Sequence, residues 1–151
     1  MDDRELTFMK WGEKTNFNMI INGRIEELHT KRTFMKILEN RCVVIMEGYY
    51  EWKEKDKPFS FRPKNSDHFL VAGLYTEKNE IIILTKDAIS SISHVHQRMP
   101  AILSEAEVEL WLDPKNTTNI QHIIRDSICQ KDKPLWKNIG FAELAPHVSK
   151  R

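Results

Sequence analysis

The stretch FLVAGLYTEKNEIIIL, residues 69–84, decides the fold class of this chain. It consists of an apolar run at 69–75, a polar segment at 76–80 and a second apolar run at 81–84. Apolar runs joined by a short polar segment are typical of two antiparallel strands and their hairpin loop. The stretch therefore favours antiparallel sheet at the centre of the chain over βαβ units.

Two earlier segments, residues 43–46 and 59–61, carry the same kind of strand signal. The first is apolar and partly β-branched, and the second alternates Phe-Ser-Phe, so both are expected to be strands. Closely spaced strands of this kind predict a β-rich centre for the domain.

Three other segments show helix signals. In residues 30–39, three apolar side chains fall on one face at helical spacing. Ser104 and Glu107 form a capping box, so a second helix is expected to run from there to the Asp-Pro pair at 113–114. A third is expected to begin near residue 117 and to end at the Lys-Pro pair at 133–134. The whole chain, residues 1–151, is predicted to be one α+β domain of mostly antiparallel strands with short flanking helices.

Composition limits the classes of protein to which the chain could belong. Its 151 residues are 40% hydrophobic and 30% charged, which is ordinary for one globular domain. The net charge is +1, so a nucleic-acid partner would require basic groups that are gathered locally. Cys42 and Cys129 are far apart and form no Cys-x-x-Cys pair, so neither a zinc ribbon nor a dithiol site is expected. The charged start and the short apolar runs predict no signal peptide and no membrane-spanning helix.

Four short motifs combine polar or titratable groups with aromatic residues or glycine. They are Lys10-Trp11-Gly12, Asn22-Gly23-Arg24, Gly48-Tyr49-Tyr50-Glu51-Trp52 and His96-Gln97-Arg98-Met99-Pro100. In the third motif, burial of Glu51 beside Tyr50 and Trp52 would raise its pKa towards the range useful for proton transfer. The alternative, which the residues alone favour, is a solvent-facing glutamate on an alternating strand.

The fourth motif suggests a site that handles phosphate. His96 and Arg98 would share a face of an extended segment, where arginine holds phosphate and histidine moves a proton. His94 has the same parity, but no third ligand has the spacing of a metal site, so no metal is expected. The alternative for either histidine is a structural residue held by hydrogen bonds.

The first two motifs offer groups that could bind a nucleotide. Asn22 and Arg24 share parity, and an amide can hold a hydroxyl while a guanidinium holds a phosphate. The alternative is a turn, because Asn-Gly is a common turn dipeptide. Trp11 and Trp52 could serve as stacking platforms for bases, although tryptophan is more often part of a core.

Together, and in this order, the four motifs resemble those of the SRAP family, the SOS-response-associated peptidases or abasic site processing proteins. Members of that family carry Lys/Arg-Trp-Gly, Asn-Ala-Arg, Gly-Phe-Tyr-Glu-Trp and His-x-Arg-Met-Pro. The resemblance extends from about residue 9 to the end of the chain. It implies a protein that attaches to abasic sites in single-stranded DNA through an N-terminal cysteine, whose amine and thiol form a thiazolidine with the sugar aldehyde.

The resemblance also implies roles for individual residues. Asn22 would orient the N-terminal residue and the sugar, Glu51 would transfer protons and take part in peptide cleavage, and His96 would assist opening of the sugar ring. The implied DNA-binding set consists of two phosphate-contacting arginines, two channel tryptophans and one channel threonine: Arg24, Arg98, Trp11, Trp52 and Thr85. No cofactor is implied. The expected partner is single-stranded DNA with abasic sites, bound by a monomer in the bacterial cytoplasm or the eukaryotic nucleus.

The start of the chain departs from the family pattern, because it begins MDDR where members begin Met-Cys-Gly-Arg. The domain is therefore expected to be incomplete at its N-terminus, and at its C-terminus it stops where members usually continue. Cys42 and Cys129 lack a free α-amine, so the chain as given is not expected to form the thiazolidine crosslink. Three interpretations remain: a start at an internal methionine of a longer protein, a degenerate paralogue, or a single-stranded DNA-binding module without chemistry. The presence of Asn22, Glu51 and His96 favours the first.

Overall fold

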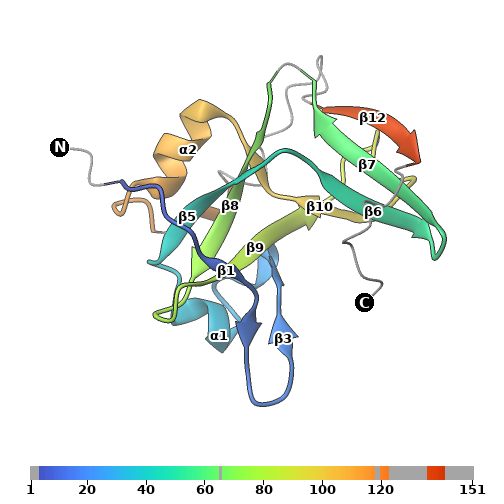
Figure 1. The fold of residues 1–151 in the computed structure, drawn as a ribbon. Coiled ribbons are helices and arrows are strands. Elements are labelled where there is room, and N and C mark those ends of the chain that lie inside the picture. Colours follow the sequence, from blue (N-terminus) through green and yellow to red (C-terminus); the bar gives the residue numbers. More distant parts are fainter. Residues whose placement is uncertain (1–3, 65, 118–119, 123–135, 142–151) are drawn as a thin grey trace.

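The computed structural model describes residues 4–64, 66–117, 120–122 and 136–141 (Figure 1). Strands make up most of the regular structure in these residues. In chain order the elements are β1 (Lys10–Trp11), β2 (Glu13–Lys14), β3 (Met19–Ile20), β4 (Asn22–Arg24), the 3₁₀ helix η1 (Ile25–Glu27), α1 (Arg32–Met35), β5 (Arg41–Met46), β6 (Tyr49–Glu54), β7 (Lys57–Pro63), β8 (Phe69–Tyr75), β9 (Glu80–Asp87), β10 (Arg98–Pro100), β11 (Ile102–Leu103), α2 (Glu105–Leu112) and β12 (Trp136–Phe141). The predicted α+β class, rich in strands with short helices, is confirmed.

The hairpin predicted from residues 69–84 lies at the centre of the larger sheet. Strands β8 and β9 pair in antiparallel register, with Gly73 opposite Ile83. The loop closes through the Thr76 amide, which donates to the carbonyl of Glu80 at 3.0 Å, and Asn79 adopts a left-handed φ of 57°. Strand β5 pairs with the outer edge of β8, also antiparallel. The prediction of mostly antiparallel strands is therefore correct for this core.

The other edge of β9 is covered by two short strands that run parallel to it. Strand β1 pairs with the start of β9, and β4 pairs with its middle, where Asn22 lies opposite Ile83 and Arg24 opposite Thr85. The segment Asn22-Gly23-Arg24 is thus a strand, and the alternative of a turn is wrong. Gly23 lies so close to Phe34 that a Cβ atom would approach the ring Cζ to 2.9 Å.

The large sheet forks where β8 and β9 separate, and the segment 98–103 inserts between them. Its first half, β10, pairs with β9 (Figure 1). Its second half, β11, pairs with β8. Ala101 joins the two sides, because its amide donates to the Leu84 carbonyl at 2.8 Å and its carbonyl accepts from the Ala72 amide at 2.9 Å. The residues just before this segment, including His96, are therefore anchored at the middle of the sheet.

Two apolar clusters lie on opposite faces of the large sheet. Successive side chains of a strand point to opposite faces. On β8, Ala72 and Leu74 belong to one cluster, whereas Phe69 and Val71 belong to the other. The first cluster includes Trp111 and the residues of η1 and α1 that face the sheet. The second is continued by the smaller sheet, in which β7 pairs with both β6 and β12.

The helices agree with the sequence in part. Helix α2 begins as predicted, since the Ser104 hydroxyl accepts from the Glu107 amide at 3.3 Å and the Glu107 carboxylate accepts from the Ser104 amide at 2.7 Å. The expected helix over residues 30–39 is much shorter, covering only Arg32–Met35. Lys31 supplies no side-chain cap there, and Phe34 alone fills the buried position while the chain turns towards β5.

Of the third expected helix, residues 120–122 are helical and Ile120 is buried. Residue 117, near its predicted start, is not helical, and its remaining predicted positions lie outside the described residues, as does Cys129. Within the described ranges, no helix is long and apolar enough to cross a membrane.

Candidate active site

A pocket of about 550 Å³ opens on the face of the large sheet that carries the odd-numbered residues of β9. Its wall is built from β1, β4, β5, β6, β9, β10, η1 and the chain just before α1 and β10. Seven of the eight site residues predicted from the sequence line it: Trp11, Asn22, Arg24, Glu51, Thr85, His96 and Arg98. The fold therefore brings together side chains from all four sequence motifs.

Trp52 is the predicted residue that the structure leaves outside this pocket. It follows Glu51 on β6 and is 38% exposed, but it is not part of the wall. Tyr49 and Tyr50 of the same strand line the pocket instead. The aromatic lining on this side thus comes from residues that precede the carboxylate.

Trp11 stands at the edge of the pocket with more than half of its surface exposed. Its indole N–H donates to the carbonyl of Ile21 at 2.9 Å, which fixes the ring, and 55% of the side chain remains accessible. The chain turns sharply behind it at Gly12, whose φ is +100° and whose Cβ position would lie 3.0 Å from the Met19 sulfur. A fixed, accessible ring is the arrangement required for stacking on a base.

Strand β4 presents Asn22 and Arg24 to the pocket, because Gly23 between them faces Phe34 in the core. Both side chains are exposed. Arg24 forms no ion pair with any residue that the structure describes, so its charge is available to an anion. This strand therefore supplies an amide and a guanidinium on one face.

Glu51 and His96 form the titratable pair of the site. The His96 Nδ1 lies 3.8 Å from Glu51 Oε1, and 26% of the glutamate side chain is exposed. Burial raises the pKa of Glu51, while the nearby His96 and a hydrogen bond from the Trp52 backbone act in the opposite direction. The Glu51 carboxyl group is half-buried and faces the pocket. The alternative interpretation, a solvent-facing glutamate on an alternating strand, therefore does not fit its position.

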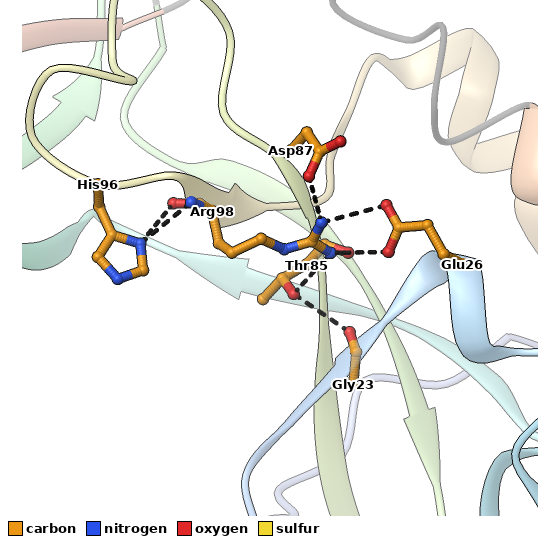
Figure 2. A network of polar contacts seen from close by, with 6 residues as sticks. All are labelled: Gly23, Glu26, Thr85, Asp87, His96 and Arg98. Carbon is orange, nitrogen blue, oxygen red and sulfur yellow. Dashed lines mark hydrogen bonds and ion pairs between the residues drawn. The ribbon is translucent and has the colours of Figure 1, made fainter.

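The ring of His96 is held by the backbone of Arg98. The Arg98 amide lies 3.1 Å from Nδ1, and the Arg98 carbonyl lies 3.2 Å from the same nitrogen. Figure 2 shows this contact beside the polar network of the Arg98 side chain, which involves Glu26, Asp87 and Thr85. His96 and Arg98 both line the pocket, but His96 lies in irregular chain before the bend at Gln97, and Arg98 is the first residue of β10.

His94 takes no part in the pocket. Its ring packs edge-on against Phe59, with ring centroids 6.5 Å apart and an interplanar angle of 86°. The spacing of His94 and His96 therefore does not place the two imidazoles at one site. Among the described residues, no three histidine, cysteine or acidic side chains form a group that could hold a metal ion.

Cys42 belongs to strand β5 and is separate from the pocket. Burial raises the pKa of its thiol to about 12. The thiol is therefore protonated at neutral pH, which makes it a poor nucleophile. Cys42 therefore acts as a small apolar residue of β5.

Lys31 and Tyr49 are among the pocket-lining residues that were not predicted as site residues from the sequence. Lys31 is half-exposed, lies 5.2 Å from the centre of the Phe34 ring and pairs with Glu27 at 3.5 Å. The four-residue spacing of Glu27 and Lys31, which is typical of ion pairs on helices, was the sequence signal that could have indicated this contact. The Tyr49 hydroxyl is buried without a hydrogen-bond partner in the described structure, and burial, followed by the charge of Glu51, raises its pKa. Its position two residues before Glu51 on one strand could have indicated its place in the pocket.

Comparisons with known proteins agree with this arrangement of motifs. Residues 1–140 match the model of the family described as SOS response associated peptidase (SRAP). The abasic site processing protein YoqW of Bacillus subtilis is 33% identical over 130 residues, covering 72% of this chain and 58% of YoqW. YobE, an abasic site processing protein of the same organism, is 34% identical over 130 residues, covering 72% of this chain and 59% of its own. The chain thus spans less than two thirds of the length of these relatives.

Solved structures show the same fold. A crystal structure of a protein from Bacteroides thetaiotaomicron superposes with a TM-score of 0.70 at 24% identity, covering 82% of this chain and 59% of that one. A second, from Bordetella bronchiseptica, gives a TM-score of 0.60 at 20% identity, covering 80% of this chain and 64% of that one. At these identities the likeness concerns the fold alone.

Proposed function

Because the chain belongs to the SRAP family, we propose that it processes abasic sites in single-stranded DNA at the pocket lined by Asn22, Glu51 and His96. One observation carries the proposal. Three side chains that are far apart in sequence, an amide, a carboxyl and an imidazole, meet in one pocket. Beside them lies the Arg24 guanidinium, which has no ion-pair partner among the described residues. Such a set can hold a phosphate next to groups that move protons.

The chemistry proposed for Glu51 and His96 is opening of the abasic sugar ring. A closed abasic sugar is a hemiacetal, so opening it removes the proton of the anomeric hydroxyl, breaks the bond from C1′ to the ring oxygen and protonates that oxygen. Burial raises the pKa of Glu51, which makes its carboxylate a stronger proton acceptor than that of an ordinary glutamate. His96 serves as its partner, and the Asn22 amide orients the sugar hydroxyls.

The DNA strand is proposed to cross the pocket along β4 and β9. Arg24 is exposed and has no carboxylate partner among the described residues, so it is assigned a backbone phosphate. Trp11 offers its accessible face to a neighbouring base. Thr85 and Arg98 complete the wall beside this path. Trp52 is proposed as a second stacking residue, outside the pocket, on the exposed part of β6.

The thiazolidine crosslink of the family is proposed only for a form of the protein that carries an N-terminal cysteine. Among the described residues, the free cysteine is Cys42, and its buried, protonated thiol lies away from the pocket wall. Ring opening and crosslinking are therefore separable steps here. The first needs only residues that the pocket contains.

Two measurements test the proposal. Fluorescence anisotropy compares binding of a labelled single-stranded oligonucleotide with one central abasic site and of the same oligonucleotide with thymine there. A hydroxylamine reagent, which reacts with the open aldehyde, then reports how fast the protein opens the sugar. We expect tighter binding of the abasic strand and faster trapping, with Glu51→Gln and His96→Ala retaining binding and losing the acceleration. Binding with no acceleration in the wild type would identify a non-catalytic DNA-binding module, and absence of binding would refute both functions.

A further inference from the structure

Lys31 adds a further positive charge to the wall of the pocket. Among the described residues, the cationic side chains that line the pocket are Arg24, Lys31 and Arg98. The Arg98 guanidinium is paired with the carboxylates of Glu26 and Asp87. Each nucleotide of a DNA strand carries a phosphate, so a strand that crosses the pocket brings more than one negative charge to this wall. Lys31 is therefore a candidate for a second phosphate contact beside Arg24.

The backbone of Lys31 is held between η1 and α1. Its amide donates to the Glu27 carbonyl at 2.9 Å, and its carbonyl accepts from the amides of Phe34 and Met35, both at 3.0 Å. The side chain of Lys31 therefore extends from a fixed point of the fold towards the pocket.

The Lys31 ammonium group lies near the strand that bears Arg24. Its Nζ is 5.2 Å from the centre of the buried Phe34 ring, which is within the range of a cation–π interaction. The same ring abuts β4, because a Cβ atom at Gly23 would lie 2.9 Å from the ring Cζ. Phe34 thus contacts both β4 and the ammonium group, and it brings Lys31 close to the exposed guanidinium of Arg24.

The ion pair of Lys31 with Glu27 is of the kind that a phosphate can replace. The Lys31 Nζ lies 3.5 Å from Glu27 Oε2, and 50% of the lysine side chain and 40% of the glutamate side chain are exposed. Water screens an exposed pair of this kind, so the pair contributes little to stability. A phosphate oxygen can therefore take the place of the carboxylate without a change in the fold.

We propose that Lys31 contacts a backbone phosphate of single-stranded DNA, next to the phosphate assigned to Arg24, and that Glu27 competes with the DNA for Lys31. The path of the strand along β4 rests on the proposed function. Contacts to phosphate hold a strand in place and carry no information about its bases. Lys31 therefore adds affinity for the strand and adds no preference for the abasic site. When the strand dissociates, the Glu27 carboxylate pairs with the ammonium group again.

Lys31→Gln tests the phosphate contact. The logarithm of the binding constant falls linearly with the logarithm of salt concentration, by about 0.7 per phosphate contact on single strands. Anisotropy titrations of Lys31→Gln are expected to show a slope reduced by about 0.7, and by the same amount on the abasic strand and on the thymine-containing strand. Lys31→Met is a second variant if Lys31→Gln fails to fold. A wild-type slope in the folded variant would overturn the inference.

Two control variants separate this contact from a general effect of charge. Lys31→Arg keeps a cation at the position and should keep the wild-type slope. Lys36→Gln removes an exposed lysine at the other end of α1, outside the pocket, and should also keep it. A slope reduced equally in Lys31→Gln and Lys36→Gln would mean that overall charge alone is measured, which would overturn the contact.

Glu27→Gln tests the competition for Lys31. Without the carboxylate, binding of both strands is expected to be tighter by up to about fivefold, the range of an exposed ion pair, with the wild-type slope. Weaker binding would mean that Glu27 orients Lys31 for the DNA, and it would overturn the competition.

The outcomes for Lys31 and for the proposed function can be told apart. If the wild type binds both strands equally and does not accelerate aldehyde trapping, the proposed function fails, and the slope of Lys31→Gln still decides the phosphate contact. If the wild type prefers the abasic strand and accelerates trapping while Lys31→Gln keeps its slope, only the inference about Lys31 fails. Absence of binding to either strand would overturn both.

Discussion

His96 Nδ1 lies 3.8 Å from Glu51 Oε1, although 44 residues separate the two in the chain. The imidazole favours the ionised carboxyl group, and the half-buried position favours the neutral one. Burial is the larger influence, so the pKa of Glu51 is raised. The protonation of the Glu51 carboxyl group therefore depends on both its burial and the neighbouring His96.

Replacing Glu51 with glutamine should stabilise the protein above the ordinary glutamate pKa of 4.5. The folded state holds the Glu51 proton to a higher pH than the unfolded state does, so the free energy of unfolding falls as pH rises through this interval. Glu51→Gln removes that loss. Urea unfolding from pH 4 to pH 8 should show the two proteins diverging as pH rises, in favour of the variant, and then remaining a constant distance apart. Curves that stay parallel over the whole range would contradict a raised pKa.

Arg24→Gln should weaken binding of single-stranded DNA and lower the dependence on salt. One lost phosphate contact corresponds to a decrease of about 0.7 in the slope of log K against log salt. The slope is obtained from anisotropy titrations between low and moderate potassium chloride concentrations. Arg62→Gln, at an exposed arginine of β7 outside the pocket, serves as the control. Equal slopes for Arg24→Gln and wild type would remove Arg24 from the phosphate path.

Trp11→Ala should cost more binding free energy than Trp52→Ala. Stacking of a base on an aromatic ring contributes about 1–3 kcal/mol, and Trp11 stands at the pocket edge whereas Trp52 lies outside the wall. Paired titrations with abasic and thymine-containing strands measure both losses. A greater loss for Trp52→Ala would place the path of the DNA over β6 instead of over β1.

Gly23→Ala should destabilise the fold by about 1–3 kcal/mol, because the added methyl group overlaps the Phe34 ring. Shortening the ring should relieve the overlap, so the free energy of unfolding of the double variant Gly23→Ala/Phe34→Leu should be higher than additivity predicts. Denaturant unfolding of the two single variants and the double variant tests this. Strict additivity would mean that the two residues are not in contact.

The sequence predicted the central hairpin well, because two long apolar runs and a polar loop of five residues leave few alternatives. The capping box of α2 was equally clear, because the Ser104 and Glu107 side chains each accept a hydrogen bond from the backbone amide of the other residue. These contacts depend only on the local sequence. The short α1 was overestimated, because apolar spacing shows which face is buried and does not show where tertiary contacts end a helix. The dipeptide Asn22-Gly23 was ambiguous for a related reason: whether its glycine serves a turn or a close approach depends on Phe34, a distant residue.

The sequence predicted which residues belong to the candidate site better than it predicted how they are arranged in space. Motif order identified seven residues of the pocket wall, but not that Trp52 lies outside it. The sequence also did not predict the ion-pair partners of the Arg98 side chain. Glu26 and Asp87 are ordinary charged residues in sequence, and only the pairing of β10 with β9 brings them to one guanidinium.

The fork of the large sheet couples unfolding of the candidate site to unfolding of the core. Ala101 is bonded on both sides, so the strand that follows His96 cannot detach without breaking the ladder at Leu84 and Ala72. Amide hydrogens at this junction should exchange with deuterium only through global opening, whereas those of β2 and β3 at the margin should exchange earlier. The imidazole and the core therefore share one cooperative unit, and mild denaturation should abolish the function and the fold together.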